Sequence, residues 1–144
     1  MAGFWQMLKG LYNVLVGHQN KVQVLLPDGA VAKTVTDGGG AWTMGAYMEI
    51  IDPTTEDYVL TGVDVYTVTN AVAHQIDIAI GAAGSEAVIA SVPFMIGTAS
   101  DSKVMPVDHL EIRKGVRLAA RQSNSAGGGT TVLVKLVLQK DYKG

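Results

Sequence analysis

The hydrophobic period of the chain changes at Lys21, and this change constrains the fold more than any other feature. In residues 2–16, large apolar residues recur at helical spacing. From Lys21 onward, aliphatic and β-branched residues alternate with polar ones in short runs, and turn residues separate these runs at intervals of about ten residues. Such alternation is typical of half-buried strands, and closely spaced strands of this kind favour an all-β sandwich or barrel.

We therefore predict an antiparallel, jelly-roll-like β-sandwich of about eight strands over residues 21–144. An amphipathic helix and a short hinge are predicted to precede it in residues 1–20. At 144 residues the chain is long enough for one domain with a real core. No second helix is expected, which excludes a sheet built from βαβ units.

The clearest strand signal lies in residues 72–81, where isoleucines alternate with Gln75, Asp77 and Ala79. We expect the isoleucines to face the core and the other three to face outward. Residues 86–94 are the expected partner strand. Other segments follow weaker patterns: a hairpin over 21–36 around Pro27-Asp28-Gly29, a strand over 41–51 with a bulge at Gly45, a long strand over 58–70 bent at Gly62, an irregular or short strand over 104–112, and strands over 115–122 and 130–139.

Composition excludes several functional classes. Hydrophobic residues make up 48% of the chain and charged residues 17%, and the formal net charge of −2 supplies no field that would attract nucleic acid. The absence of cysteine excludes disulfides and thiolate chemistry. No apolar stretch approaches the ~20 residues that span a bilayer, and the first residues do not resemble a secretory signal. We expect a soluble protein with no nucleic-acid or membrane partner.

A glycine-containing stretch, "GAAGSE" at residues 81–86, is the nearest approach to a nucleotide-binding loop. A phosphate-binding P-loop needs a longer glycine spacing, a lysine and a following helix. This stretch has no lysine, and the residues after it have a strand pattern. We predict a hairpin connection.

The chain also lacks the usual signs of catalysis. Its three histidines, His18, His74 and His109, have none of the short spacings typical of metal sites, and there is no Gly-x-Ser-x-Gly elbow for a nucleophilic serine. Carboxylates are scattered over loops, as in any sandwich of this size, and do not identify a glycosidase pair. We predict a non-enzymatic protein without a cofactor or a metal.

The N-terminal segment carries the most distinctive candidate surface. Its large apolar side chains follow one helical face, which must be buried against something. It would fold back on its own sandwich, pack against symmetry-related copies, or dock on another protein. We predict that this arm acts in assembly or attachment through Phe4, Trp5, Leu8, Leu11, Tyr12 and Leu15.

Two further groups of residues are candidate contacts with subunits or partners. Trp42 and Tyr47 follow the glycine-rich residues 37–40, and we expect Trp42 to pack at a sheet edge or an oligomer interface. Arg113, Arg117 and Arg121 alternate outward and would form a solvated face or pair with acids of a neighbouring subunit.

The stretch "LTGVDVYTVTNAVAHQIDIAIGAAGSEAVIASVPFMIG" and the later "IRKGVRLAARQSNSAGGGTTVLVKLVLQ" resemble a pattern in structural proteins of tailed bacteriophages. The resemblance covers roughly residues 60–139 and consists of strand and turn residues. It implies a small jelly-roll virion protein, such as a capsid decoration (cement) protein, a head fibre or spike, or a tail adaptor. It offers no catalytic residues.

The resemblance further implies a homo-oligomer, often a trimer, that is made in the host cytoplasm and bound to the major capsid protein or another virion protein at the capsid surface. Two alternatives stay open: a tail or fibre adaptor, and a carbohydrate-binding jelly roll. In the second alternative, Trp42, Tyr47 and the loops at 37–40 and 123–129 would form the sugar site.

Overall fold

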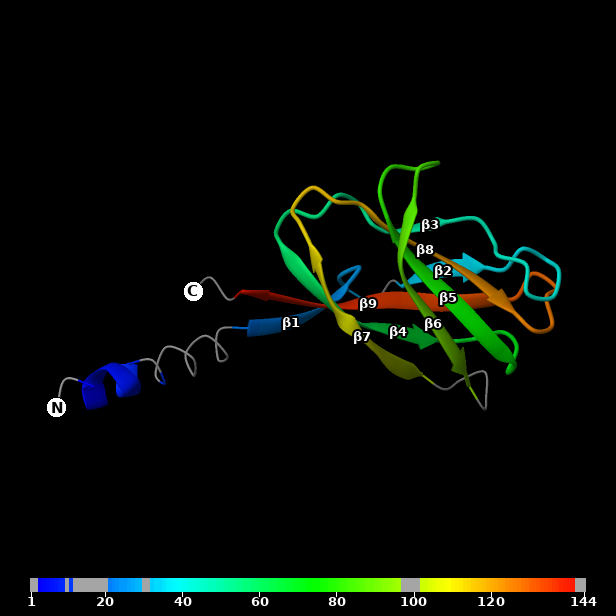
Figure 1. The fold of residues 1–144 in the computed structure, drawn as a ribbon. Helices are drawn as coiled ribbons and strands as arrows, with labels where there is room; N and C mark the ends of the chain where they lie inside the picture. The colour runs from blue at the N-terminus through cyan, green and yellow to red at the C-terminus, as the bar shows by residue number, and fades with distance from the viewer. Residues whose placement is uncertain (1–2, 10, 12–20, 30–31, 97–101, 142–144) are drawn as a thin grey trace.

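The computed structural model describes residues 3–9, 11, 21–29, 32–96 and 102–141. These residues form two antiparallel β-sheets in a sandwich-like arrangement, together with a short helix at residues 3–9 that is helical again at residue 11 (Figure 1). The prediction of an antiparallel sandwich with an N-terminal helix is confirmed at this level. The division into an arm and a domain at residue 20 stays a prediction.

Nine strands make up the two sheets in the described residues. The first sheet has the order β1-β9-β4-β7, with β2 also paired to β9, and the second has the order β3-β8-β5-β6. The strands are β1 (Lys21–Leu26), β2 (Lys33–Thr36), β3 (Met48–Ile51), β4 (Tyr58–Tyr66), β5 (Ala73–Ile80), β6 (Ala87–Met95), β7 (Lys103–Ile112), β8 (Leu118–Asn124) and β9 (Thr131–Asp141).

The core lies between the two sheets and consists of the alternate residues that the sequence predicts. In β9, Val132, Val134, Leu136 and Leu138 are all fully buried, and Leu118 and Ala120 of β8 face them from the other sheet. The predicted pairing of residues 72–81 with 86–94 is confirmed as the antiparallel pair β5–β6.

The predicted hairpin over residues 21–36 is wrong. β1 and β2 do not pair with each other but lie one after the other along the same edge of β9, β1 against Leu136–Asp141 and β2 against Thr131–Val134. The turn signal at Pro27-Asp28-Gly29 is real, but the chain continues along β9 after it. A local turn motif interrupts the strand here without reversing the chain, and it does not identify the strand that supplies the hydrogen bonds.

Three other strand predictions also change. The sequence predicts one strand over residues 41–51 with a bulge at Gly45, but strand geometry begins only at Met48. Gly45 instead lies so close to Thr36 that a Cβ there would be 1.9 Å from the Thr36 carbonyl oxygen. Residues 104–112 form most of the ten-residue strand β7, whose pairing with β4 shifts register between Leu60 and Gly62. The expected bend at Gly62 is thus a register shift, and β4 ends at Tyr66.

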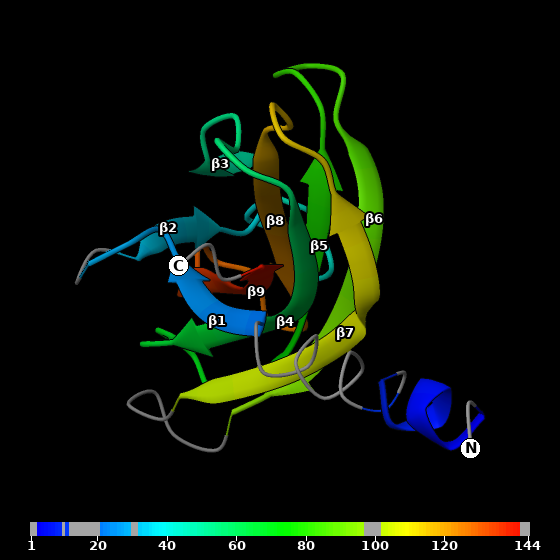
Figure 2. The ribbon, with the colours of Figure 1, turned by 90° about the vertical axis from the view of Figure 1, so that its left-hand side faces the viewer.

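The two ends of the sandwich differ. The helix and the start of β1 lie at one end, and the glycine-rich loops 37–47 and 125–130 lie together at the opposite end (Figure 1). The turned view in Figure 2 shows the helix standing apart from both sheets, at the lower right of that view. An assembly that uses the helix therefore contacts the opposite end of the molecule from one that uses the glycine-rich loops.

Candidate interaction surfaces

The N-terminal helix exposes nearly all of its large apolar side chains. Phe4, Trp5, Met7, Leu8 and Leu11 are between 37% and 69% exposed. Phe4, Leu8 and Leu11 share one face at the spacing i, i+4, i+7, and Gln6 lies on the opposite face. Tyr12 and Leu15, which were predicted to extend this face, lie outside the described residues. The helix thus presents an apolar stripe that its own sandwich does not cover.

The glycine-rich loops at the opposite end are joined by a buried carboxylate, Asp37. Its Oδ1 accepts hydrogen bonds from the backbone N–H groups of Gly39 (2.7 Å) and Gly129 (3.0 Å). Its Oδ2 accepts from Asn124 Nδ2 (2.6 Å) and from the backbone N–H of Thr130 (2.8 Å). Both loops are therefore tied to one side chain.

Burial raises the pKa of Asp37, but the hydrogen bonds from the Gly39 N–H, the Asn124 amide and Thr130 outweigh it and hold the pKa below its ordinary value. Asn124 continues the connection, because its Oδ1 accepts from the backbone N–H groups of Ala126 and Gly127. Gly127 itself packs so closely on the other loop that a Cβ would be 2.6 Å from the Gly40 carbonyl carbon. These contacts order an end of the molecule whose sequence suggests only flexible glycine.

This ordered end presents Trp42. Its backbone N–H donates to the Asn124 carbonyl at 2.7 Å, its φ of 55° is in the left-handed region, and its side chain is 54% exposed. The prediction that Trp42 packs at a sheet edge or an oligomer interface stays a prediction: Trp42 lies on a loop whose backbone bonds to the end of β8, and its side chain is exposed. Tyr47 lies elsewhere on the same loop region, where the guanidinium of Arg121 sits 4.7 Å from its ring centroid.

The outward arginines of β8 are paired within the chain. Arg117 bonds to Glu49 (2.7 Å) and Glu86 (3.1 Å), and Arg121 bonds to Asp77 (3.1 Å). The expectation of a solvated positive face, or of pairing with a neighbour's acids, is wrong for these two residues. The acids come from strands β3 and β5 and from the residue before β6.

Small residues allow these arginines to lie across the sheet. Ala79 and Ala119 are partners across β5–β8, lie on the outer face, and are fully buried. Asp77 is buried as well, and its Oδ1 also accepts from the Ser91 hydroxyl at 2.6 Å. Asp77 and Ala79 point to the outer face of the sheet, as predicted. They are nevertheless buried, because the ion-paired arginines lie over this face.

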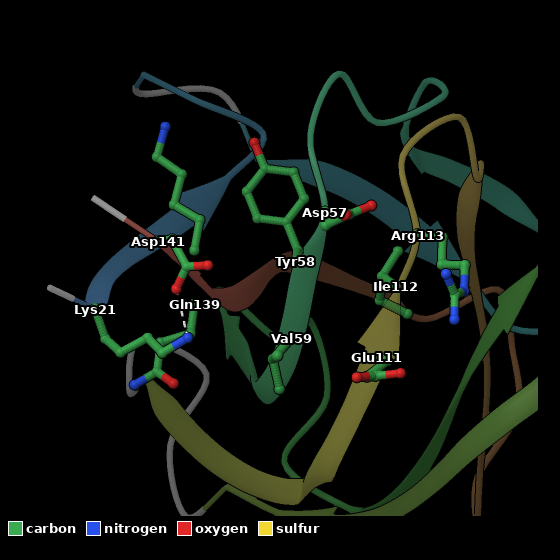
Figure 3. A pocket seen from close by; sticks show the side chains of 10 residues that line it. Lys21, Asp57, Tyr58, Val59, Glu111, Ile112, Arg113, Gln139 and Asp141 are labelled. Carbon is green, nitrogen blue, oxygen red and sulfur yellow. Dashed lines mark hydrogen bonds and ion pairs between the residues drawn. The ribbon is translucent and has the colours of Figure 1, made fainter. Parts of the chain in front are cut away.

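The third arginine, Arg113, is exposed and lies at the helix-bearing end, where it lines a small pocket of about 220 Å³ (Figure 3). The pocket carries charges of both signs, and several are already bonded: Lys21 pairs with Asp141, and Asp57 accepts the Lys114 backbone N–H at 2.7 Å. Its volume is below the ~300 Å³ of ordinary ligand sites. The pocket gives no basis for a ligand.

In the "GAAGSE" loop, the carboxylate of Glu86 binds the loop's own backbone. The Gly84 backbone N–H donates to a carboxylate oxygen of Glu86 at 2.9 Å, and the Ser85 N–H donates to the Ala82 carbonyl. Glu86 has a pKa below its usual value because its own backbone N–H, Arg117 and the Gly84 N–H together outweigh the effect of burial. The loop connects β5 to β6 as predicted, and the Gly84 N–H is already bonded to the carboxylate of Glu86.

His74 is a core residue. It is buried, stacks on Phe94 with ring centroids 5.0 Å apart, and bonds to Gln122 Oε1 and the Asn70 carbonyl. Gln122 in turn donates to the carbonyls of Val35 and Thr130. Within the described ranges no group of three or more His, Asp or Glu side chains is placed to hold a metal ion. His18 lies outside those ranges.

The buried polar residues Asp37, Gln122 and Asn124 were not singled out from the sequence. A signal existed for Asp37, which directly precedes three glycines, and for Asn124, which lies three residues before three glycines, because Asp and Asn commonly cap turns through their side chains. Gln122 gave no such signal, since its partners come from β2 and from the residue before β9.

A scan against models of protein families found no match to the chain, and searches of curated proteins and of solved structures found none either. Within the part of the chain that the structure describes, no helix has the length and apolarity needed to cross a bilayer.

Proposed function

We propose that the chain is a non-enzymatic structural protein of a tailed-bacteriophage virion, a capsid decoration protein that assembles as a homotrimer on the particle surface. The exposed apolar helix carries this proposal. An apolar stripe of this size is costly to leave in water, and it marks a surface that another molecule covers. The resemblance of residues 60–139 to structural proteins of tailed bacteriophages is the reason for proposing a phage particle.

The strand order supports the finer assignment of a jelly roll. A jelly roll has eight strands in two sheets, connected as two Greek keys. If β1 and β2 count as one interrupted strand along β9, each sheet has four strands. Every connection from β2 to β9 except β5–β6 then passes from one sheet to the other, as a jelly roll requires.

The arrangement of the two ends also suits a particle-surface protein. The helix projects from one end, while Asp37 and Asn124 order the loops of the other end through buried hydrogen bonds. One end would then attach while the other faces outward. A closed oligomer multiplies a modest contact per subunit, so a small helix per copy suffices for firm attachment.

The test replaces apolar residues of the helix with a charge. We expect Leu8→Asp and Leu11→Asp to abolish oligomerisation or co-sedimentation with empty capsids of the source virus, because a buried unpaired carboxylate is strongly unfavourable. The β-sheet circular dichroism should not change, since the helix stands apart from the sandwich. Gln6→Asp is the matched control, with the same added charge on the opposite face of the same helix.

If the Leu8 and Leu11 variants both remain oligomeric and still bind particles, the helix has no role in assembly and the proposal loses its main support. If the Gln6→Asp control also loses binding, assembly depends on helix formation or net charge rather than on the apolar face.

A second candidate function is carbohydrate binding, and the exposed Trp42 favours it. An indole held by a rigid loop presents a flat apolar face, which suits a sugar ring. Specific binding on an oligosaccharide array that Trp42→Ala abolishes would support this candidate over decoration. A tail or fibre adaptor would instead co-sediment with tails and not with empty capsids.

A further inference from the structure

The strand β6 differs from all the others in charge. Of the nine strands in the described residues, it is the one that contains no charged side chain. It is also the border strand of its sheet, bonded to β5 alone among these strands (Figure 2). Charged residues are one of the means by which proteins keep exposed border strands from associating. A border strand without them is a candidate contact surface.

Four side chains of β6 point to the outer face of the sheet, because they lie opposite the outward residues 73, 75, 77 and 79 of β5. All four are exposed. The two large ones, Val88 and Met95, are 44% and 60% exposed. We name this set the β6 ridge; it consists of Val88, Ser91, Pro93 and Met95.

The backbone of β6 does not favour a sheet that continues into another molecule. Pro93 has no N–H to donate, and the register between β5 and β6 shifts between Ile78 and Ala79. Both features interrupt the row of free backbone groups that a further strand would need. A molecule that binds here therefore contacts the side chains of the ridge.

The charges next to the ridge are already paired within the chain. Arg121 bonds to Asp77, and Arg117 bonds to Glu49 and Glu86. Covering a charge that keeps its partner costs less than covering one that is left alone. The other sheet offers no comparable surface, since every one of its strands contains charged residues.

We propose that the β6 ridge packs against the β6 ridge of a second copy, with the two strands antiparallel about a two-fold axis. Such a contact brings the same patch of both copies together, so any charge on the patch would lie close to an identical charge. An uncharged ridge avoids this repulsion, which makes a second copy the suitable occupant. Val88 of each copy then lies near Met95 of the other.

The small size of the ridge sets the strength of the contact. Four side chains bury much less than the ~800 Å² per partner of a standard interface. The contact is therefore weak between two free molecules and becomes effective where many copies are held side by side. This goes beyond the proposed function, in which the helix attaches the protein to the particle, and different variants remove the two contacts.

Cross-linking tests the arrangement, because the chain has no cysteine of its own. Full-length Val88→Cys would be mixed with a mass-tagged Met95→Cys chain and treated with a short bismaleimide. We expect links between the two different chains. Links between two Val88→Cys chains should be rare, since residues 88 and 95 lie about 20 Å apart along the strand and the axis passes between them. Val104→Cys replaces Met95→Cys in the matched control, because Val104 is 61% exposed and lies on the other sheet.

Native mass by light scattering gives the second measurement. In the full-length Leu8→Asp chain, which lacks the helix contact, we expect the mass to rise toward twice its dilute value as the concentration increases. A further Val88→Lys substitution should abolish this rise, because it places a charge in the apolar contact. Val104→Lys should leave the rise unchanged. The β-sheet circular dichroism should be the same in all variants.

The inference is overturned if the Val104→Cys control cross-links as well as Met95→Cys, or if Val88→Cys chains link to each other as readily as to Met95→Cys. It is also overturned if no link forms and the mass of the Leu8→Asp chain does not rise, which would leave the ridge to a different molecule. If the ridge contact is found while the Leu8→Asp and Leu11→Asp chains still bind particles, the proposed role of the helix fails and the inference stands.

Discussion

The Asp37 cluster gives the sharpest test of how this fold is held together. Asp37→Ala removes the acceptor for four donors, of which the Asn124 side-chain amide and the Thr130 backbone N–H are in buried contacts. Each buried donor left without a partner costs about 1–3 kcal/mol. The two buried donors together predict a loss of about 2–6 kcal/mol, a large part of the 5–15 kcal/mol that stabilises a typical domain.

Urea unfolding of the full chain, followed by the β-sheet circular dichroism, measures this loss. Asp28→Ala is the control, because among the described residues the Asp28 carboxylate accepts only the exposed N–H of Gly29 in the same turn. The control should change the free energy of unfolding by no more than about 0.5 kcal/mol. If Asp37→Ala is as stable as Asp28→Ala, the loops are held by other contacts and the reasoning is wrong.

The same carboxylate predicts a pH dependence. Its pKa in the folded protein is held below the ordinary value of 3.8, so in acid the unfolded chain binds this proton before the folded protein does. Stability from Asp37 is therefore fully present above about pH 4 and is lost as the pH falls toward the folded pKa. Asp37→Asn should be less stable at neutral pH, and its difference from the wild type should shrink below about pH 4. A difference that stays constant down to pH 2 would contradict this assignment.

Two further predictions concern close packing and the outer ion pairs. Gly45→Ala should lower the free energy of unfolding by more than about 3 kcal/mol in urea, because the new Cβ would be 1.9 Å from the Thr36 carbonyl oxygen; a loss below 1 kcal/mol would mean that the loop moves freely. Arg117→Ala should lower the free energy of unfolding in the same assay by leaving Glu86 without its cation, and by more than Lys114→Ala, because Lys114 is exposed and makes no ion pair in the described residues.

The sequence predicts which side chains of a strand point into the core better than it predicts which strands pair with each other. The alternation in β9 correctly identifies the buried face of that strand, because side-chain direction has a period of two in any strand. The hairpin over residues 21–36 fails, because β1 takes its hydrogen bonds from residues more than one hundred positions later in the chain. A local pattern contains no information on that distant partner.

The helix shows the same contrast between what a local pattern predicts and what depends on distant contacts. Its apolar spacing is evident from the sequence, and the exposure of Phe4, Trp5 and Leu11 is consistent with the surface that the spacing predicts. Whether the sandwich itself covers the stripe is a tertiary question. In the structure the helix stands apart from both sheets, so the sandwich does not cover the apolar stripe (Figure 2).

By itself, the sequence determined that the chain is an all-β protein with an amphipathic N-terminal helix, since both follow from the periods of its apolar residues. Only the tertiary structure decided that Arg117 and Arg121 are paired within the chain and that the loop around Asp37 is rigid. The physical reason is that the energies of charges and buried hydrogen bonds depend on which groups the fold brings within about 3 Å, and those groups come from strands far apart in the sequence.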